Sequence, residues 1–501
     1  MIKMTKIKNG YVRGIAAADP RVISYKGIPY AKPPVGEYRW REPQPCEDWI
    51  GVRDCIEFSP ISMQSIPGTD QENIYTKEWN VDSDITMSED SLYLNVWTPA
   101  KSPQDKLPVF FWIHGGALQW GNSAEMEFDG ERLARRGIVV VTINYRLNVF
   151  GFFAHPDMLG DMQEGNLNVG NLDQQMALRW TKENISAFGG NPDQIVIGGQ
   201  SAGGGSVLTQ LNCAENKGYI QGAIISSGII GDPFKNRFSV TLEEAMENGK
   251  NFLEFLGVSS IEQARKLPAE YIRDKNDEYG KFWGTVIDGT FQTDTIFQNI
   301  KKKVFLDVPL LLGWTNNEFW TQAESQDEKE LKQEAHRIFG DEKTHWMKLL
   351  GFESNQGINL EKSRVNSMEI GTRMFCEIEE DIEYSSQKYV YEFGAEIPGI
   401  DDPGAFHSSD LWFFFETLAK CWRPFVGKHY DLARQMCNYW VNFVKYGNPN
   451  GKDLTGSTME EWNSFSSSTP NIMYFYDTPK QKRKVVSEMQ QFYIDYIKRG
   501  L

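Results

Sequence analysis

Several features that would set a chain apart from ordinary globular enzymes are missing from this sequence. No stretch approaches the roughly 18 consecutive apolar residues that a membrane-spanning helix needs, and the amino-terminal residues lack the apolar core of a signal peptide. Basic residues are outnumbered, because 52 Lys and Arg stand against 68 Asp and Glu and give a net charge of -16. This charge disfavours nucleic acid and anionic membranes as partners. We therefore expect a soluble, cytoplasmic protein.

Cysteine is also scarce in this chain. The 6 cysteines are widely spaced, form no C-x-x-C pair and are too sparse for a disulfide scaffold. We expect most of them to be free, buried thiols. No cluster of His, Cys and Asp has the spacing of metal ligands, so we expect neither a metal nor an organic cofactor. The cysteines are Cys46, Cys55, Cys213, Cys376, Cys421 and Cys437.

The sequence is rich in short apolar runs that alternate with helical segments between residues 107 and 228. Residues 173–188 space Met176, Ala177, Trp180 and Ile185 for one buried helical face. Strand and helix in alternation are typical of a parallel sheet that is covered on both faces by helices. The runs that we expect to form strands are PVFFWI, GIVVVTINY, QIVIGG and GAIISS.

The rest of the chain adds edges and insertions to this sheet. Short apolar pieces broken by Gly and Pro before residue 41 predict antiparallel strands and loops at a sheet edge. Charged helical stretches after residue 228 are interrupted by VPLLLGW and YVYEFGA, which we expect to be further core strands. We therefore predict one domain over residues 1–501, with cap insertions roughly within 232–300 and 320–388, and carboxyl-terminal helices over 430–447 and 486–498.

Ser201 is the candidate nucleophile. It lies in the G-x-S-x-G motif Gly199-Gln200-Ser201-Ala202-Gly203, between an expected strand and an expected helix. A strand-to-helix turn of this kind needs small neighbours and exposes the serine hydroxyl at the carboxyl edge of the sheet. The weaker interpretation is a glycine-rich turn with an incidental serine.

Backbone N–H groups that could stabilise an oxyanion occur in two places. One is Ala202, directly after the candidate nucleophile. The other is the loop His114-Gly115-Gly116-Ala117, in which small residues allow a close backbone approach. We expect His114 itself to be a structural residue of that loop.

The general base must be chosen from the histidines that follow Ser201, because α/β-hydrolases order their catalytic residues as serine, acid and histidine. His407 is favoured, since it lies in a Pro/Gly loop before an aromatic helix. His336 and His345 lie in charged helical stretches, and His429 lies at the start of a helix. On these grounds the three remain alternatives.

Glu318 is the favoured orienting acid. It follows the expected strand VPLLLGW, so its carboxylate should lie at the same sheet edge as Ser201. A buried acid that accepts a hydrogen bond from the imidazole fixes the tautomer and stabilises the imidazolium. Asp288 and Asp410 remain alternatives on this evidence.

These motifs, taken in order, resemble the type-B carboxylesterase and cholinesterase-like family, especially its bacterial para-nitrobenzyl-esterase-like members. The resemblance runs along nearly the whole chain, through YKGIPYAKPPVGEYRW, SEDSLYLNVW, VFFWIHGGALQWG, GGQSAGG, VPLLLGWTNNE, GAFHSSDLWFFF and YWVNFVKYGNPNG. It implies the α/β-hydrolase fold and a serine carboxylesterase that hydrolyses small esters without a cofactor. It also implies a triad of Ser201, Glu318 and His407, and an oxyanion hole formed by Gly116, Ala117 and Ala202.

The chain departs from the family pattern at several positions. Ser91 stands where many members have a cysteine, so that family disulfide cannot form. Gln200 replaces the usual glutamate before the nucleophile, and Phe319 replaces the usual glycine after the triad acid. Leu118 stands where an aromatic residue is common. We expect these changes to alter specificity and hydrogen bonding around the triad rather than the class of reaction.

Substrate preference is the least determined property. An apolar acyl or alcohol pocket suited to aryl or medium-chain esters could be lined by Trp120, Trp283, Phe319 and Trp412, with Trp320 and Phe413 nearby in the sequence. A non-catalytic adhesion module is the competing hypothesis, and an amidase or peptidase with the same triad is a third. The sequence does not decide between a monomer and a homodimer.

Overall fold

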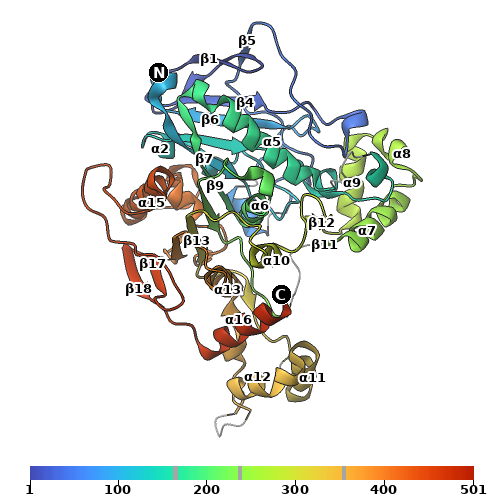
Figure 1. The fold of residues 1–501 in the computed structure, drawn as a ribbon, viewed down its shortest axis with the longest axis vertical. Coiled ribbons are helices and arrows are strands. Elements are labelled where there is room, and N and C mark those ends of the chain that lie inside the picture. The colour runs from blue at the N-terminus through green and yellow to red at the C-terminus, as the bar shows by residue number, and fades with distance from the viewer. Residues whose placement is uncertain (71, 80, 162–166, 235–239, 326, 353–356) are drawn as a thin grey trace.

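The computed structural model describes residues 1–70, 72–79, 81–161, 167–234, 240–325, 327–352 and 357–501. Its centre is a sheet of 11 strands in the order β18-β17-β16-β13-β10-β9-β7-β8-β6-β4-β3 (Figure 1). The middle strands run parallel to one another, which confirms the predicted mostly parallel sheet. They are β8 (Val139–Ile143), β7 (Leu107–Ile113), β9 (Gly190–Gln200), β10 (Gly222–Ser226), β13 (Leu310–Thr315), β16 (Lys388–Phe393) and β17 (Asn471–Phe475).

Antiparallel strands complete the sheet at both ends. β18 (Pro479–Arg483) pairs with β17 at one end, and β6 (Tyr93–Thr98), β4 (Ile23–Pro29) and β3 (Ile15–Ala16) follow β8 at the other. This arrangement confirms the antiparallel edge expected for the amino-terminal residues. A separate small sheet is formed by β1 (Met4–Ile7), β2 (Gly10–Arg13) and β5 (Val52–Asp54).

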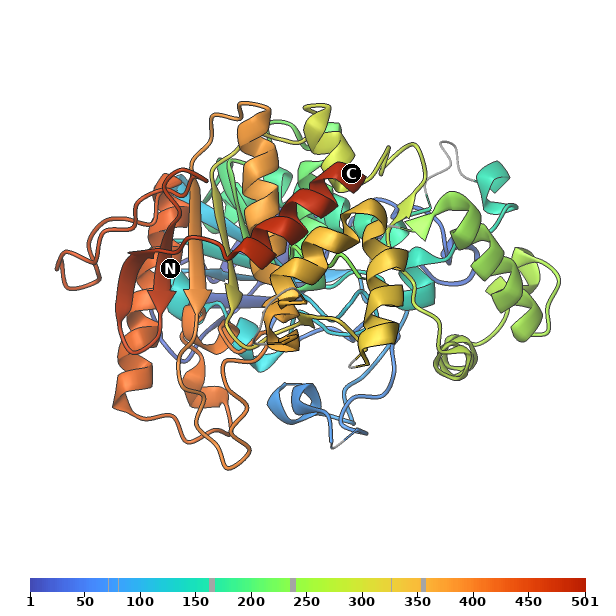
Figure 2. The same ribbon diagram turned by 90° about the horizontal axis from the view of Figure 1, so that it is seen from below.

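The two faces of the sheet carry two different apolar cores, because side chains alternate along each strand. In β7, Phe111 and Ile113 belong to the core that also holds residues of α5 (Val169–Asn184) and α6 (Ala202–Leu211). Phe110 and Trp112 belong to the core on the opposite face, which is covered by α15 (Gly427–Tyr446). Helices therefore cover both faces, as predicted (Figures 1 and 2).

The helix expected over 173–188 begins earlier than predicted. α5 begins at Val169, and residues Ile185–Phe188 form a 3-10 turn that ends at Gly189. Its buried side includes polar residues such as Asp173 and Gln174, which an apolar periodicity does not reveal. The two carboxyl-terminal helices are α15 and α16 (Glu488–Gly500), close to their predicted ranges.

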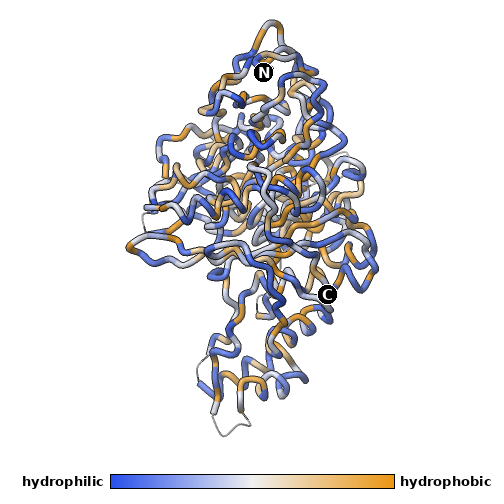
Figure 3. The backbone as a smooth tube through the Cα atoms, turned by 90° about the vertical axis from the view of Figure 1, so that its left-hand side faces the viewer, coloured by the Kyte–Doolittle hydropathy of each residue, from blue (hydrophilic) through white to orange (hydrophobic). Residues whose placement is uncertain are grey.

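Helical segments lie in both long connections between core strands. Between β10 and β13 these are α7 (Leu242–Phe255), α8 (Ile261–Arg265), α9 (Ala269–Tyr279) and α10 (Ile296–Lys301), with the short strands β11 (Val240–Thr241) and β12 (Val286–Ile287). Between β13 and β16 they are α11 (Glu328–Phe339), α12 (Lys343–Leu350) and α13 (Ser367–Asp381), with β14 (Trp320–Thr321) and β15 (Val365–Asn366). The part with α11 and α12 extends from one end of the molecule (Figures 1 and 3). Residues 235–239, 326 and 353–356 of the predicted insertions lie outside the described residues.

The cysteines are unpaired, as expected. All 6 are free thiols, and Cys55, Cys213, Cys376 and Cys437 are buried, whereas Cys46 and Cys421 are half-buried. In the described part of the chain, we find no helix with the length and apolar character that crossing a membrane requires.

Candidate active site

The candidate nucleophile occupies a strained turn. Ser201 lies between β9 and α6 with φ 57° and ψ -128°, a conformation that a non-glycine residue rarely adopts. Its backbone N–H donates to Ser226 O at 2.9 Å, which ties the turn to the end of β10. The strain is therefore held by the sheet, and the structure places Ser201 on the strand-to-helix turn predicted from the motif.

Glycine is required on both sides of this turn. A Cβ atom at Gly203 would lie 2.2 Å from Ile113 O, at the end of β7. A Cβ atom at Gly199 would lie 2.3 Å from the carbonyl carbon of Gly203. Only residues without a side chain allow α6 to start this close to the two strands, which explains the glycines of the motif.

The loop after β7 brings further backbone N–H groups next to the serine. A Cβ atom at Gly115 would lie 3.3 Å from Ser201 Cβ, and Gly116 and Ala117 continue the turn with φ of 101° and 54°. Among the residues that the structure describes, no acceptor is found for the backbone N–H of Gly116, Ala117 or Ala202. Unpaired backbone donors beside a nucleophile are suited to binding an oxyanion.

His407 and Glu318 form a hydrogen-bonded pair at the same sheet edge. His407 Nδ1 contacts Glu318 Oε2, and the Glu318 side chain is fully buried. The other carboxylate oxygen, Oε1, accepts from the Thr315 N–H at 2.7 Å and from Ser227 Oγ at 2.8 Å. These donors fix the orientation of the carboxylate.

None of the alternative acids and bases is hydrogen-bonded to the Glu318–His407 pair in the part of the chain that the structure describes, although Asp410 lies close enough to both residues to interact electrostatically. Asp288 accepts from the backbone N–H groups of Thr290 and Gln292 in a turn before α10, and Asp410 accepts from Tyr391 Oη at 2.7 Å. Burial raises the pKa of Asp410 to about 6. His336 and His345 lie on α11 and α12, and His429 Nδ1 accepts from the Val426 N–H at the start of α15.

His114 is buried and stacks on Tyr145, with ring centroids 4.5 Å apart. Its Nδ1 is 2.8 Å from Gly115 O, so this nitrogen carries the proton and donates. Burial lowers the pKa of His114 to about 4, which keeps the imidazole neutral. These contacts are those of the structural loop residue that we expected.

The second nitrogen of His407 meets an unexpected partner. Gln200 Nε2 lies 3.2 Å from His407 Nε2, and both side chains are buried. In the described residues, we find no hydrogen bond between Ser201 Oγ and His407. Gln200 and His407 are 207 positions apart, so no local sequence pattern could have predicted their contact.

Two aromatic side chains enclose the imidazole of His407. The Phe319 ring lies 4.4 Å from it, and Tyr75 approaches edge-on at 6.4 Å. Tyr75 comes from α1 (Ile74–Glu78), a short helix in the segment between β5 and β6 that sequence analysis did not connect with the site. Burial, followed by the charge of Glu318, raises the pKa of Tyr75 to about 12.

The other predicted pocket aromatics are distributed unevenly. Trp120 is 41% exposed on the loop that follows Gly116 and Ala117. Trp412, which follows His407 closely in the chain, is buried against Trp79. Trp283 is buried in a cluster with Phe153, Phe252 and Tyr279, although its carbonyl accepts from Gln119 Nε2 at 2.6 Å. Trp320 is partly exposed under Arg364, and Phe413 is buried.

Ser91 and Leu118 have distinct environments. Ser91 Oγ lies 3.0 Å from Ser62 Oγ in a buried pair, so a hydrogen bond closes the segment that carries α1. Leu118 follows Ala117 with φ 62°, and its carbonyl accepts from the Asn148 N–H at 2.7 Å. This bond helps to hold the loop that carries the unpaired N–H groups.

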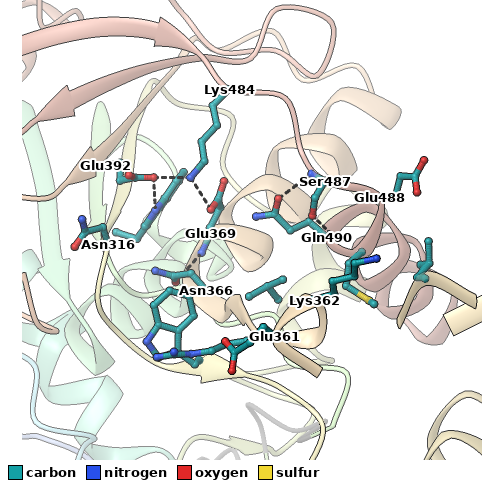
Figure 4. A pocket seen from close by; sticks show the side chains of 16 residues that line it. Asn316, Glu361, Lys362, Asn366, Glu369, Glu392, Lys484, Ser487, Glu488 and Gln490 are labelled. Carbon is teal, nitrogen blue, oxygen red and sulfur yellow. Dashed lines mark hydrogen bonds and ion pairs between the residues drawn. The ribbon is translucent and has the colours of Figure 1, made fainter. Parts of the chain in front are cut away.

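A cavity of about 590 Å³ lies beside the segment that carries Glu318, but none of the triad candidates lines it. Figure 4 shows Lys484 between Glu369 and Glu392, and the ammonium group contacts them at 2.8 Å and 2.7 Å. Asn366, also in its wall, donates to Thr315 O at 2.9 Å. The inner polar groups are thus already paired within the protein. Within the described ranges, no three His, Cys, Asp or Glu side chains are grouped to hold a metal ion.

Comparison with known sequences gives one consistent answer. A model of the carboxylesterase family matches residues 2–493. The chain is 32% identical over 482 residues to pyrethroid hydrolase Ces2e of Rattus norvegicus, which covers 89% of this chain and 82% of that protein. It is 31% identical over 468 residues to para-nitrobenzyl esterase of Bacillus subtilis (strain 168), with 88% and 89% covered.

Solved structures agree with the sequence comparison. A PNB esterase matches with a TM-score of 0.80 and 27% identity, over 98% of this chain and 100% of that one. Carboxylesterase EST55 of Geobacillus stearothermophilus matches with a TM-score of 0.76 and 29% identity, over 98% and 99% of the two chains. These matches confirm the α/β-hydrolase fold and the resemblance that the motifs predicted.

Proposed function

The chain belongs to the carboxylesterase family and is a carboxylic ester hydrolase, and we propose that it works through an acyl-enzyme formed on Ser201. The observation that carries this proposal is the meeting of two features at one sheet edge. The strained turn presents Ser201 beside unpaired N–H groups. The Glu318–His407 pair lies next to this turn, because His407 contacts Gln200, the residue before Ser201.

In the proposed reaction, Ser201 Oγ attacks the ester carbonyl carbon while His407 Nε2 takes its proton. Glu318 accepts from Nδ1–H throughout and stabilises the imidazolium that forms. The N–H groups of Gly116, Ala117 and Ala202 bind the oxygen that becomes negative. The imidazolium then gives its proton to the departing alcohol. In the second half of the reaction, His407 takes a proton from the water molecule that attacks the acyl-enzyme and returns it to Ser201 Oγ as the acid leaves.

We propose aryl or medium-chain esters as substrates. The support is the half-exposed Phe319 ring over His407 and the exposed Trp120 next to the oxyanion loop, which offer apolar surface near the reacting atoms. The name of one relative, para-nitrobenzyl esterase, also denotes an ester of an aromatic alcohol. Matched ester and anilide substrates test the preference over amides, and we expect the ester to react faster.

We also propose that the whole chain acts as one domain whose first insertion caps the site. The support is the bond from Gln119 on the oxyanion loop to Trp283 in that insertion. A cytoplasmic location suits the 6 free thiols, because disulfides form in oxidising compartments. Limited proteolysis that released a stable, folded fragment would contradict the single domain.

The test of the main proposal is hydrolysis of a series of para-nitrophenyl acyl esters by the purified chain and by Ser201→Ala. Ser186→Ala, at an exposed position after α5, is the matched control. We expect turnover by the wild type and by Ser186→Ala, with loss of about 10³-fold or more in Ser201→Ala. Equal activity of Ser201→Ala and the wild type would overturn the proposal.

A further inference from the structure

The imidazole nitrogen that must accept the serine proton is already engaged in the structure. His407 Nδ1 faces the Glu318 carboxylate, so this nitrogen carries the hydrogen and donates it. Nε2 therefore presents a lone pair, and the Gln200 amide at 3.2 Å donates an N–H to it. The amide is shielded from water, since Gln200 is only 3% exposed.

We propose that Gln200 is a positioning residue that holds His407 Nε2 in the resting enzyme and yields this nitrogen to Ser201 when an ester binds. The inference rests on the proposed function, because it concerns the same acid–base pair. It assigns a role to a position at which this chain departs from the glutamate that the family resemblance leads one to expect.

An amide and a carboxylate at this position act in opposite ways on the imidazole. The Gln200 amide donates to the neutral ring without adding charge, so it favours the form of His407 that can act as a base. A carboxylate can only accept hydrogen bonds, and it would favour the imidazolium by charge and by hydrogen bonding. Gln200 thus keeps the base available at lower pH than a glutamate would.

The charged and titratable groups that already surround His407 determine how strongly an added carboxylate at position 200 would act on the imidazole. Glu318 supplies a buried carboxylate from the segment after β13. Asp410 lies at the start of α14 (Leu411–Phe414), and Tyr391 of β16 donates to it. Tyr75 faces the ring from α1. Among the described residues of these elements, no cation is paired with His407. A second carboxylate, at position 200, would therefore act directly on the imidazole ring.

The exchange of partners also has a structural basis. A Cβ atom at Gly115 would lie 3.2 Å from Gln200 Oε1 and 3.3 Å from Ser201 Cβ. The amide and the serine are therefore next to the same backbone turn, on adjacent residues. In the proposal, a rotation of the Gln200 side chain on ester binding replaces the amide by the hydroxyl of Ser201 as the partner of His407 Nε2.

The test compares pH profiles of kcat/KM for a para-nitrophenyl ester in the wild type, Gln200→Glu and Gln200→Met. Methionine has a similar shape without a hydrogen-bond donor or a charge, so it separates packing from electrostatics. We expect the acid limb of Gln200→Glu to move to higher pH by about 1 unit or more. Its activity should fall roughly tenfold at the acid end and recover in alkaline buffer, with kcat changing more than KM.

Gln200→Met should move the acid limb to higher pH by less than Gln200→Glu does, because it loses the amide donor but adds no charge near His407. An unmoved acid limb in Gln200→Glu, or an equal movement in both variants, would overturn the proposal. A wild type that is silent on every ester would refute the proposed function instead, so the two failures are distinguishable.

Histidine-¹⁵N NMR provides a second measurement that needs neither turnover nor the charged variant. At neutral pH we expect His407 Nε2 to resonate as an unprotonated, hydrogen-bonded nitrogen in the wild type. In Gln200→Met its resonance should move toward that of a free imine nitrogen. Identical Nε2 resonances in the two proteins would overturn the contact on which the proposal depends.

Discussion

Two clusters of charged side chains lie close to the ends of the neighbouring strands β13 and β16. In the cavity cluster, Lys484 contacts Glu369 and Glu392, and each carboxylate has a further donor, Arg373 or Trp314. In the cluster that we propose to be catalytic, called the catalytic cluster below, Glu318 has similar support from Thr315 and Ser227, but His407 Nε2 meets a single neutral amide.

The difference separates charge that stabilises from charge that reacts. In a cluster whose charges are all paired, removal of one partner is destabilising, because it leaves a charge of the other partner unpaired. A reactive group needs a partner that can be replaced during the reaction. The two clusters lie in segments connected to the same two strands. We expect substitutions in the catalytic cluster to lower turnover and substitutions in the cavity cluster to lower stability.

The largest expected effect is on turnover in the catalytic cluster. Glu318→Gln keeps the shape of the side chain but removes the charge that fixes the tautomer of His407. We expect kcat to fall by about 10⁴-fold, with the circular dichroism spectrum unchanged. Steady-state hydrolysis of a para-nitrophenyl ester measures it, with Ser201→Ala as the lower limit. A loss of less than tenfold would show that Glu318 is not the orienting acid.

The cavity cluster should show the reverse pattern. Lys484→Met leaves Glu369 and Glu392 without their shared cation, and we expect the free energy of unfolding to fall by about 2 kcal/mol, less than for a fully buried pair because Lys484 is partly exposed. The value of kcat should stay within about threefold of the wild type. Urea unfolding measures the stability, and Lys482→Met, at an exposed position on β18, is the control. A large loss of turnover in a folded Lys484→Met would contradict the separation of the two clusters into a stabilising and a catalytic one.

The third test uses pH, because the catalytic edge also contains the buried neutral imidazole of His114. Its pKa is lowered to about 4 by burial, while the unfolded chain titrates near 6.5. Between these values the unfolded state binds more protons, so stability present above pH 6.5 is lost as the pH falls. We expect this group to remove about 2 kcal/mol between pH 7 and pH 5.

The matched variants for this test are His114→Gln and His345→Gln, the second at an exposed position on α12. Urea unfolding at pH 7 and pH 5 should show a pH dependence reduced by about 2 kcal/mol in His114→Gln only. An unchanged pH dependence in His114→Gln would mean that another group causes the acid sensitivity.

The sequence predicted the parts of these regions that depend on local pattern. Apolar runs revealed β7, β9, β10 and β13, and the G-x-S-x-G motif with its flanking elements revealed the turn at Ser201. The position of Glu318 followed from the rule that residues after parallel strands meet at one edge. His407 was favoured because it lies in a Pro/Gly loop before an aromatic helix, and the structure pairs it with Glu318.

The contacts that distinguish the two clusters were not predictable in this way. Gln200 and His407 meet across 207 positions, and Lys484 reaches Glu369 across 115. Tyr75 approaches the site from an irregular segment with little periodicity. Such pairs depend on how loops fold over the sheet, and no spacing along the chain records that.

The smallest expected effect concerns the backbone at Ser201. Its φ of 57° with ψ of -128° costs about 1–3 kcal/mol for a residue with a side chain, and glycine adopts it freely. Ser201→Ala keeps this strain, whereas Ser201→Gly relieves it but loses about 0.4–1 kcal/mol through the more flexible unfolded chain. We therefore expect Ser201→Gly to be more stable than Ser201→Ala by about 1 kcal/mol in urea unfolding. Equal stability of the two variants would mean that the turn stores no strain. The predicted gain would show that the backbone strain at Ser201, next to the catalytic cluster, lowers the stability of the protein in order to hold the nucleophile in place.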